Sequence, residues 1–571
     1  MEQKVGESKM SVTSALSEVE KRISTVRKVW FDNPEMEISE KPHQIRGIRW
    51  CILKEMGYFY DSKNNELVKQ KKTGIICDEM GLGKTTVIMA TWIANFKPGQ
   101  KTLVVVPPAL FNQWATKIRQ WYGFAPYEFH GYNSKISKNE LELIMSSPSK
   151  TNHDSATPIV LTTYPMISTR NSPFSKKKNT GKVKKPYHSI LWDIDWDRVI
   201  YDEAHHLRNA KANKHSGAKL VKSKITWLLT GTPIQNTDKD LLSQFKIMGI
   251  YEDMMRCEPD DRIKFIKPYV LQRTKDHLGI DMPSLTSEIV EITEYDSAEE
   301  KLMLKYIHSQ LNFTNVAINA ANVDKHILRY LSGDSPLPML TRARQACVCP
   351  SIITSHLKNI EREEDIPANI KRMDVTTHTK IRLITENIIQ KKSEDVNTLV
   401  FCHYVDEMNL ISSMLEDAGL DVKMLNGKTT HKQRKIIPTL TPDVLLVQIQ
   451  SCCEGLNLQQ FSNVIFTSPH WNPAVEDQAI ARSHRLGQTK PVTVYKYICD
   501  GLGDGTCSID RYCMSVQDAK REKMDDFKKN TMEQISTNER EETKNQETKN
   551  QETKNQETKN QETKKEKIKK E

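Results

Sequence analysis

The chain has 571 residues, which is too long for a single hydrophobic core, so we expect two domains with appendages. Hydrophobic residues make up 37% and charged residues 27%, and no apolar run approaches the roughly 18 residues that a membrane-spanning helix needs. The charged N-terminus also lacks the apolar stretch of a signal peptide, so we expect an intracellular protein with no membrane partner. The net charge of +10 favours a polyanionic partner.

The cysteines agree with an intracellular protein. None of the eleven forms a Cys-X-X-Cys pair, so the sequence patterns of zinc ribbons, RING fingers and thioredoxin-type redox sites are missing. Cys347 and Cys349, with His356 nearby, are compatible with half of a metal site. The ordinary alternative is a set of reduced thiols without a ligand role, which is the usual state inside cells.

The first predicted element in chain order is a helix near the N-terminus. Its apolar residues are spaced four and three apart, which places them on one helical face; they are Val12, Leu16, Val19, Ile23, Val26 and Trp30. The run is shorter than the roughly three to four heptads of a coiled coil. This face therefore docks on the rest of the chain, belongs to a fraying helix, or contacts a partner.

From about residue 40 to 250, short apolar segments alternate with helical stretches or loops, as in a parallel sheet covered on both faces. The predicted strands are residues 73–77, 102–106, 159–163, 199–201 and 226–229. Residues 171–192 interrupt this pattern with a cluster of lysines and no acidic residue; the lysines are Lys176, Lys177, Lys178, Lys182, Lys184 and Lys185. The stretch is a solvated surface loop, a phosphate contact or a nuclear-import signal.

Residues 251–375 change character and are predicted to be mostly helical and charged. A second α/β pattern follows, with predicted strands at residues 398–402, 422–425, 444–447, 463–467 and 492–497. A charged helical stretch is then predicted from about Asp500 to Asn530. From Glu542 to Gln561 the chain repeats Glu-Thr-Lys-Asn-Gln, which lacks apolar residues, so we predict a disordered tail.

The first candidate for chemistry is the loop that follows the predicted strand 73–77. Gly81 and Gly83 let the backbone approach closely, and the helix after them directs its N-terminal amides at phosphates. Lys84 would neutralise the β- and γ-phosphates of a nucleotide, and Thr85 would offer its hydroxyl to Mg²⁺. The usual phosphate-loop pattern has glycine where this chain has Asp78, so this motif needs a partner.

That partner is Asp202-Glu203-Ala204-His205, which comes directly after a largely apolar predicted strand. An aspartate at the end of a strand can hold Mg²⁺, usually through water, and the adjacent glutamate can polarise the attacking water. We therefore predict Asp202 as a Mg²⁺ ligand, Glu203 as the residue that activates water, and ATP hydrolysis as the reaction.

With these motifs, the chain from about residue 41 to 523 resembles the SWI/SNF-type ATPases of helicase superfamily 2, double-stranded DNA translocases that include chromatin remodellers. The resemblance rests on segments that follow the family's order: residues 42–47, 78–85, 104–107, 161–164, 202–205, 229–236, 268–275, 342–350, 400–402, 426–428, 454–458, 468–473 and 478–488. The resemblance implies that Asp78 belongs to the family's own form of the phosphate loop. It also implies that Gln44 reads adenine.

The last of these segments suggests a second half of the site. If residues 473–485 form a helix, Gln478, Arg482 and Arg485 lie at i, i+4 and i+7 on one face. Such a face can reach across a cleft to the γ-phosphate, and arginine fingers of this type are worth on the order of 10³–10⁵ in rate. Hydrolysis would then be fast only when two lobes close.

The resemblance implies three groups of site residues. The catalytic residues are Lys84, Asp202, Glu203, Gln478, Arg482 and Arg485. The nucleotide contacts are Gln44, Asp78, Glu79, Met80, Gly81, Leu82, Gly83, Lys84, Thr85 and Thr86, with Thr85 and Asp202 on Mg²⁺. The nucleic-acid contacts are Thr162, Thr163, Thr232, Gly427, Gly455, Asn457 and Trp471.

Two places depart from the family pattern. Gln272 stands where the family has an arginine, and Cys452 and Cys453 stand where it usually has two glycines. Glycine permits backbone conformations that cysteine resists, so we expect DNA contact or lobe closure in that second loop to be altered.

The predicted fold class is α/β, with two RecA-like lobes that have parallel sheets, a helical linker and protrusion segment between them, and a disordered C-terminal tail. The predicted boundaries are 1–35 for an N-terminal extension, 36–250 for the first lobe, 251–375 for the linker, 376–500 for the second lobe, 501–535 for a brace-like helical segment and 536–571 for the tail.

The resemblance implies an ATP- and Mg²⁺-dependent translocase on double-stranded DNA that remodels or displaces bound proteins in chromatin, repair or transcription. The alternatives are a strand-separating RNA or DNA helicase of the same superfamily and a catalytically silent nucleic-acid tether. Double-stranded DNA is the implied partner, with nucleosomes or other DNA-bound proteins, in the nucleus or in a viral replication compartment. No bromodomain, chromodomain or RING pattern supports nucleosome targeting.

Overall fold

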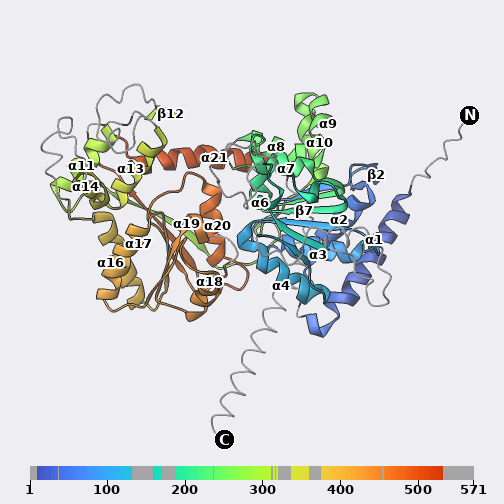
Figure 1. The fold of residues 1–571 in the computed structure, drawn as a ribbon, viewed down its shortest axis with the longest axis horizontal. Coiled ribbons are helices and arrows are strands. Elements are labelled where there is room, and N and C mark those ends of the chain that lie inside the picture. Colours follow the sequence, from blue (N-terminus) through green and yellow to red (C-terminus); the bar gives the residue numbers. More distant parts are fainter. Residues whose placement is uncertain are drawn as a thin grey trace, which may run out of the picture. The chain divides into compact units, whose positions relative to one another are not determined.

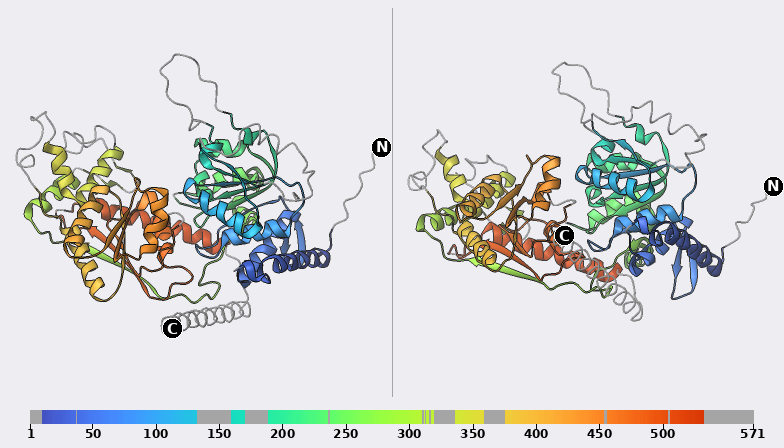
Figure 2. Two further views of the ribbon diagram at one scale, coloured as in Figure 1. Left: turned by 60° about the horizontal axis from the view of Figure 1, so that its bottom comes forward. Right: turned by 90° about the horizontal axis from the view of Figure 1, so that it is seen from below.

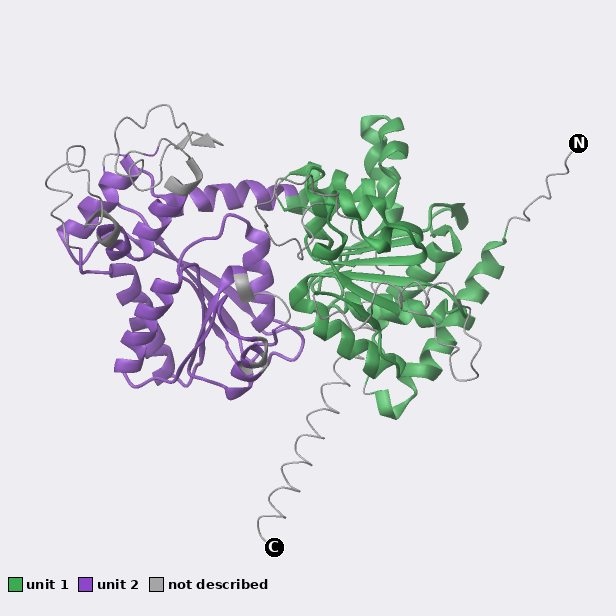
Figure 3. Cartoon of the chain, in the orientation of Figure 1, with its two compact units in different colours: residues 1–281, 524–571 green, residues 282–523 purple. Residues whose placement is uncertain are grey.

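The computed structural model describes residues 10–36, 38–131, 159–169, 188–235, 237–309, 311, 313–314, 317–318, 336–358, 375–452, 456–503 and 505–531. The predictions made on the lysine cluster 176–185, on Gly455 and on the repeated tail lie outside these residues. The chain forms two compact units, unit 1 (Met1–Asp281 and Met524–Glu571) and unit 2 (Met282–Lys523) (Figure 3). Among the described residues, no helix combines the length and the apolar character that crossing a bilayer requires.

Unit 1 is built on a seven-stranded parallel sheet with the strand order β5-β6-β4-β7-β8-β3-β9 (Figure 1). The strands are β3 (Thr73–Ile76), β4 (Thr102–Val106), β5 (Tyr127–Phe129), β6 (Ile159–Thr163), β7 (Asp195–Asp202), β8 (Lys222–Leu229) and β9 (Val270–Leu271). All the strands predicted for this region are present, but β7 and β8 begin before the predicted first residues, 199 and 226. The residues of these two strands that precede 199 and 226 are largely polar, so the apolar pattern of the sequence revealed only the second half of each strand.

Helices cover both faces of this sheet, because neighbouring strand residues point alternately to opposite sides. One face packs against α1 (Val12–Val26), α2 (Pro42–Met56), α3 (Lys84–Ala94) and α4 (Phe111–Tyr122). The other face packs against α7 (Asn213–Leu220), α8 (Asp238–Met248), α9 (Tyr251–Arg256) and α10 (Arg262–Ile266). A short hairpin, β1 (Tyr58–Asp61) with β2 (Glu66–Lys69), lies outside the sheet. The loops at the carboxyl ends of the strands are the usual place for a site in such a fold.

The N-terminal helix α1 docks on unit 1, which is one of the alternatives that its sequence left open. Its apolar face lies in the core that α2 and α3 share, and Figure 2 shows the dark blue helix against its blue neighbours. Trp30, just after the helix, is fully buried and its indole Nε1 donates a hydrogen bond to the carbonyl oxygen of Trp121 at 3.0 Å. The same indole stacks on Tyr122 with ring centroids 6.1 Å apart.

We expect Trp30→Ala to lower the free energy of unfolding of the first unit by about 3–5 kcal/mol, the usual cost of removing a fully buried aromatic side chain. Val29 is the matched control, because its side chain is 38% exposed and Val29→Ala should change stability by no more than about 0.5 kcal/mol. Denaturant unfolding followed by tryptophan fluorescence and circular dichroism measures both. Equal stability of the two variants would contradict the docking of this segment.

Unit 2 contains a six-stranded parallel sheet with the order β10-β17-β16-β13-β15-β14. The strands are β10 (Leu285–Ile292), β13 (Thr398–Cys402), β14 (Val422–Leu425), β15 (Val444–Gln448), β16 (Asn463–Phe466) and β17 (Val492–Cys499). All but β10 were predicted. The two parallel sheets with their covering helices confirm the α/β class and the two RecA-like lobes.

β10 corrects the prediction that residues 251–375 are mostly helical. It pairs in parallel with β17 at the edge of the sheet, from Leu285 opposite Val492 to Ile292 opposite Cys499. Of this strand only Ile292 is buried, and the first five residues are exposed. An edge strand that is open to water on both faces does not need the apolar pattern by which buried strands are recognised, so its sequence gave little sign of it.

The helices of unit 2 form two covering layers and a separate small core. α16 (Thr379–Ser393) and α17 (Val405–Asp417) pack on one face of the sheet, and α20 (Pro473–Ser483) packs on the other. The small core joins α11 (Ala298–Ser309), α13 (Pro336–Val348) and α14 (Pro350–Lys358) to the start of α21 (Ile509–Thr531). The shorter elements are α6 (Tyr164–Ile167) in unit 1, and α18 (His431–Ile436), α19 (Ile449–Cys452), β11 (Phe313–Thr314) and β12 (Ala317–Ile318) in unit 2.

Candidate active site

The glycine loop of unit 1 connects β3 to α3, as the sequence predicted. Gly81 and Gly83 have φ angles of +91° and +88°, which side chains other than glycine rarely adopt. Gly83 is the N-cap of α3, so the first amides of this helix open toward the loop. Free amides at a helix N-terminus together with flexible glycines are the donor set that a phosphate group needs.

Lys84 lies at the mouth of this loop. Its ammonium donates a hydrogen bond to the carbonyl oxygen of Asp78 at 2.7 Å, and Gly231 lies close to it from the segment after β8. Thr85 and Thr86 follow in the first turn of α3 and are partly exposed, as are Glu79 and Met80; Leu82 is buried. These residues therefore fit a nucleotide phosphate chain and its Mg²⁺ ion, with Lys84 as the cation, and their contacts with ATP stay a prediction.

Gln44 and His43 of α2 contact the backbone of the glycine loop. The Nε2 of Gln44 donates to the carbonyl oxygen of Leu82 at 3.2 Å, and the Nε2 of His43 lies 3.1 Å from the same oxygen. Burial lowers the pKa of His43 to about 3, so the imidazole is neutral and its Nε2–H is the donor. A Cβ atom at Gly83 would collide with the Gln44 amide, which explains why glycine is needed there. Adenine recognition by Gln44 stays a prediction.

Asp78, the residue that stands in place of glycine, has a structural partner. Its two carboxylate oxygens accept hydrogen bonds from the Nε and Nη2 of Arg273, the first at 3.0 Å, and both side chains are 0% exposed. Arg273 also donates to the carbonyl oxygen of His43. Two backbone bonds continue the pairing: Cys77 N to Leu271 O at 2.7 Å and Glu79 N to Arg273 O at 2.8 Å. The Asp78 side chain therefore supports the loop from inside the protein.

Asp202 is the last residue of β7 and lies at the carboxyl edge of the sheet. Its Oδ2 accepts a hydrogen bond from the indole Nε1 of Trp114 at 2.6 Å, and its Oδ1 accepts one from the Glu203 amide at 3.0 Å. The hydroxyl of Tyr164 donates to the backbone carbonyl oxygen of Asp202 at 2.7 Å. Burial raises the pKa of Asp202 to about 6, and the neighbouring Glu203 charge adds to this, while the Trp114 bond opposes it. Such a carboxylate gains from a cation beside it.

Glu203 has a strained backbone, with φ +50° and ψ 51° in the left-handed region. Residues other than glycine adopt this region at a cost of about 1–3 kcal/mol, and such strain is concentrated at functional sites. Its carboxylate Oε2 lies 3.2 Å from the Nδ1 of His205. The ring of His205 stacks on that of His206, with centroids 4.7 Å apart. The Glu203 carboxylate therefore lies beside a stacked pair of imidazole rings, directly after Asp202 in the chain.

The predicted nucleic-acid contacts of unit 1 are buried. Thr162 and Thr163 end β6, and their hydroxyls bond to the Phe129 carbonyl at 2.8 Å and to the Nδ1 of His130 at 2.9 Å. Thr232 is 4% exposed and its hydroxyl accepts a hydrogen bond from Gln235 at 3.3 Å. These hydroxyls serve the local fold, and their contact with nucleic acid stays a prediction.

In unit 2, α20 carries Gln478 and Arg482 but ends at Ser483, with His484 as its C-cap. The condition that residues 473–485 form one helix is therefore not met, because the chain leaves the helix before Arg485. Arg485 nevertheless stays near Arg482: burial lowers the pKa of Arg485, and the charge of Arg482 lowers it further. Two neighbouring guanidinium groups form a cationic pair that suits an anion.

Helix α21 holds α20 in place through a set of polar contacts within unit 2. The Gln517 amide donates to Glu476 at 2.7 Å, and Lys496 forms a buried ion pair with the same carboxylate at 2.5 Å. Arg521 contacts both oxygens of Asp477, at 2.9 and 3.2 Å. α20 is thus fixed near the turn that precedes Gln478.

The remaining predicted contacts of unit 2 are spread over separate loops. Gly427 is exposed and its amide bonds to the Gln448 side chain at 3.1 Å. Asn457 is exposed, and Trp471 is partly exposed beside Arg344, whose guanidinium carbon lies 5.8 Å from the ring centroid. Cys452 ends α19, whereas Cys453 and Gly455 lie outside the described residues. The expected effect of the two cysteines on this loop therefore stays a prediction.

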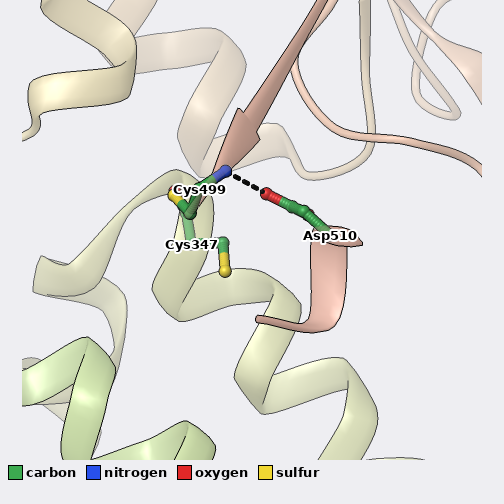
Figure 4. Close-up of side chains that lie close together, drawn as sticks. All are labelled: Cys347, Cys499 and Asp510. Atoms are coloured by element: carbon green, nitrogen blue, oxygen red, sulfur yellow. Dashed lines mark hydrogen bonds between the residues drawn. The ribbon is translucent and has the colours of Figure 1, made fainter. Parts of the chain in front are cut away.

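A thiol cluster in unit 2 differs from the metal half-site that the sequence suggested. Cys347 lies beside Cys499 and Asp510, with their ligand atoms within 4.8 Å of one another (Figure 4), whereas the Cys349 thiol contacts Ser351. Asp510 is already paired with the buried ammonium of Lys380 at 2.5 Å and with the Cys499 amide at 3.1 Å. Burial also raises the pKa of the Cys347 thiol well above its ordinary value. The cluster is therefore a structural ion-pair network.

Three residues that support the site, Trp114, Tyr164 and Arg273, were not singled out from the sequence. All three act on residues far away in the chain, since 88 positions separate Trp114 from Asp202 and 195 separate Arg273 from Asp78. The one available signal was Asp78 itself. An aspartate beside a phosphate site needs a compensating cation.

The comparisons with known proteins agree with this geometry. Residues 43–254 match the model of the SNF2-related domain, and residues 379–487 match the model of the helicase conserved C-terminal domain. The chain is 26% identical over 496 residues to the probable global transactivator of Orgyia pseudotsugata multicapsid polyhedrosis virus, covering 84% of this chain and 89% of that protein.

Cellular relatives match over a smaller share of their own length. The chain is 25% identical over 492 residues to the ISWI chromatin-remodeling complex ATPase ISW1 of Saccharomyces cerevisiae, covering 81% of this chain and 38% of that protein. It is 26% identical over 499 residues to the DNA excision repair protein ERCC-6-like of Mus musculus, covering 76% and 38%. Among solved structures, the Sulfolobus solfataricus SWI2/SNF2 ATPase core in complex with dsDNA has a TM-score of 0.33 and 20% identity, covering 82% of this chain and 89% of that one.

One family model falls in each unit, and together they cover more than half of the chain. The first contains the glycine loop and the acidic pair, and the second contains Gln478, Arg482 and Arg485. The chain is therefore a nucleic-acid-dependent ATPase, and it belongs to the SWI/SNF-type ATPases of helicase superfamily 2.

Proposed function

We propose that this ATPase is a translocase on double-stranded DNA, which advances along the phosphate backbone and displaces or remodels bound proteins. The observation that supports this most is a basic groove of about 1090 Å³ beside the acidic pair. It is lined by the chain that follows β6, starting at Pro165, by the chain that follows β7, starting at His206, and by the start of α8. We call it the basic groove; its cationic lining residues are Arg208, Lys211, Lys214 and Lys239.

The charge of the basic groove suits a polyanion. Asp240 is the single carboxylate in its lining, and it is 7% exposed. Its Oδ2 accepts hydrogen bonds from the amides of Gln235 at 3.0 Å and Thr237 at 3.3 Å, so it serves the start of α8. A groove with four cations and an engaged carboxylate attracts a phosphate backbone without reading the bases.

The nucleotide site lies on the same edge of the sheet. We assign the phosphate chain of ATP to the loop amides and Lys84, Mg²⁺ to Thr85 and Asp202, and the attacking water to Glu203. Mg²⁺ supplies positive charge for the developing phosphate charge when it is bound. Arg482 and Arg485 are assigned to the γ-phosphate when the two lobes close. Fast hydrolysis then requires closure, which couples each turnover to one step.

Lys211→Glu should weaken duplex DNA binding about equally for unrelated sequences and lower the slope of log affinity against log salt by about 1, as expected for a phosphate contact. Lys211 is exposed in the basic groove, whereas the control Lys222→Glu changes a 68% exposed lysine at the first residue of β8. Fluorescence anisotropy at several salt concentrations measures both. An unchanged slope for Lys211→Glu, or an equal change in the control, would contradict DNA binding in this groove.

Translocation is distinguished from strand separation by the product. A third strand bound to duplex DNA should be displaced with ATP, while a plain duplex with single-stranded tails should not be separated. Displacement must disappear in Lys84→Ala. Strand separation without displacement of the third strand would favour the helicase alternative. Nucleosomes or other DNA-bound proteins are the proposed obstacles, in a nucleus or a viral replication compartment.

A further inference from the structure

Asp202 receives hydrogen bonds from two aromatic residues that follow two different strands. Trp114 belongs to α4, which follows β4, and its indole donates to the carboxylate at 2.6 Å. Tyr164 begins α6, directly after β6, and its hydroxyl donates to the backbone carbonyl of Asp202 at 2.7 Å. Trp114 and Tyr164 are 3% and 1% exposed, so water does not replace these bonds easily.

The parallel register of β6, β4 and β7 places the loops after these strands next to one another at the carboxyl edge of the sheet. Val105 lies opposite Tyr201, the residue before Asp202, and Val106 lies opposite Thr163, the residue before Tyr164. Three consecutive strands of the sheet, β6, β4 and β7, therefore end side by side. A displacement of the loop after β6 or β4 must move a donor of Asp202.

The basic groove reaches the same residues through His206. His206 lines the groove, and its ring packs on Tyr164 with centroids 5.1 Å apart. It also stacks on His205, whose Nδ1 lies 3.2 Å from the Glu203 carboxylate. Pro165, which follows Tyr164 directly, lines the groove as well. Tyr164, His206 and His205 therefore form one packed aromatic set that joins the groove wall to Asp202 and Glu203. Trp114 meets this set at Asp202, to which both Trp114 and Tyr164 donate.

We propose that Trp114 and Tyr164 are positioning residues that couple occupancy of the basic groove to the orientation of the Asp202 carboxylate. This inference rests on the proposed function, since it takes the ligand of the groove to be duplex DNA. DNA that presses on the groove wall at His206 and Pro165 orders Tyr164. Tyr164 and Trp114 then fix the backbone and the carboxylate of Asp202. Outer hydrogen bonds of this kind are worth about 10–100-fold in metal affinity or activity.

The test uses Tyr164→Phe and Trp114→Phe in the full chain. Each removes one donor and keeps an aromatic ring. We expect kcat at saturating duplex DNA to fall about 10-fold, with the KM for ATP and the Kd for DNA within about twofold, the precision of such assays. The ratio of stimulated to unstimulated rate should fall with kcat. Because both residues act on one carboxylate, the double variant should lose less than the product of the single losses.

Matched controls exist on the same helix. Tyr122→Phe removes a partly buried tyrosine hydroxyl that donates to the Met89 carbonyl at 2.8 Å, and Trp121→Phe makes the tryptophan change at another position of α4. Both controls should keep the stimulation ratio. Thermal melting shows whether each variant folds, and Tyr164→Phe, which loses a single oxygen atom, is the milder of the two test variants.

The outcomes separate this inference from the proposed function. Suppose that duplex DNA stimulates the unsubstituted protein, the parent. If Tyr164→Phe and Trp114→Phe keep the parent's ratio of stimulated to unstimulated rate, the inference is overturned and the proposed function stands. The same holds if the control variants lose this ratio to an equal extent. If the parent is stimulated by RNA alone, the proposed function is overturned, and the same variants measured with RNA decide on the coupling. A parent that no nucleic acid stimulates contradicts both.

Discussion

Glu203→Gln is expected to lower the kcat of ATP hydrolysis by about 10²–10⁴-fold, the range in which a positioned general base contributes. The glutamate is held in a left-handed conformation at the end of β7, next to the carboxylate assigned to Mg²⁺. Glutamine keeps the size and the backbone strain but cannot accept a proton from water. ATP binding should therefore persist while phosphate release stops.

Phosphate release at saturating ATP and duplex DNA, together with binding of a fluorescent ATP analogue, measures the two effects separately. Lys84→Ala should instead lose both, because it removes the cation of the phosphate loop. Glu66→Gln, an exposed glutamate on β2, is the matched control for the chemical change. A Glu203→Gln variant that retains more than about a tenth of the parent kcat would exclude a general-base role for this residue.

The same substitution changes the pH dependence of stability. Burial and then the Glu203 charge raise the pKa of Asp202 from 3.8 to about 6. Because the folded-state pKa lies above the ordinary value, the associated stability is present below about pH 4 and is lost as the pH rises through about 6. Glu203→Gln removes one cause, so its melting temperature should exceed that of the parent at pH 7. The difference should shrink toward pH 4.

Arg273→Met is expected to lower the free energy of unfolding by about 3–5 kcal/mol, the usual cost of leaving one member of a buried ion pair without its partner. Asp78 would then be a charged carboxylate at 0% exposure beneath the phosphate loop. The double variant Arg273→Met with Asp78→Leu removes both charges, and much of the lost stability should return.

Denaturant unfolding of the single and double variants measures this coupling. The matched control is Arg256→Met, whose 80% exposed side chain pairs with Asp253 at the surface and should cost no more than about 1 kcal/mol. If Arg273→Met were as mild as this control, or if the double variant were no better than the single one, the buried pair would not support the loop.

The sequence predicted those parts of the fold that short, local patterns encode. The strands at 102–106, 159–163, 398–402 and 422–425 were predicted with the bounds they have, since apolar runs between polar residues mark buried parallel strands. β10 was missed because its exposure leaves it polar, and the end of α20 at Ser483 was missed because helix boundaries depend on local capping.

The candidate site divides in the same way. Lys84, Asp202 and Glu203 could be named because strand, loop and residue type occur together within a few positions. The supports could not be named, because Trp114 meets Asp202, and Arg273 meets Asp78, only through the parallel order of the sheet. A single sequence does not show the order of the strands in the sheet, and therefore does not show which distant loops are neighbours in space.

The central claim is that duplex DNA activates this ATPase, and one measurement tests it most directly. ATP hydrolysis is compared without nucleic acid and with single-stranded DNA, double-stranded DNA and RNA at equal nucleotide concentration, with Glu203→Gln as the blank. We predict the highest rate with double-stranded DNA, and a rate with RNA close to that without nucleic acid. A rate that double-stranded DNA does not change, or that RNA raises more, would contradict the account.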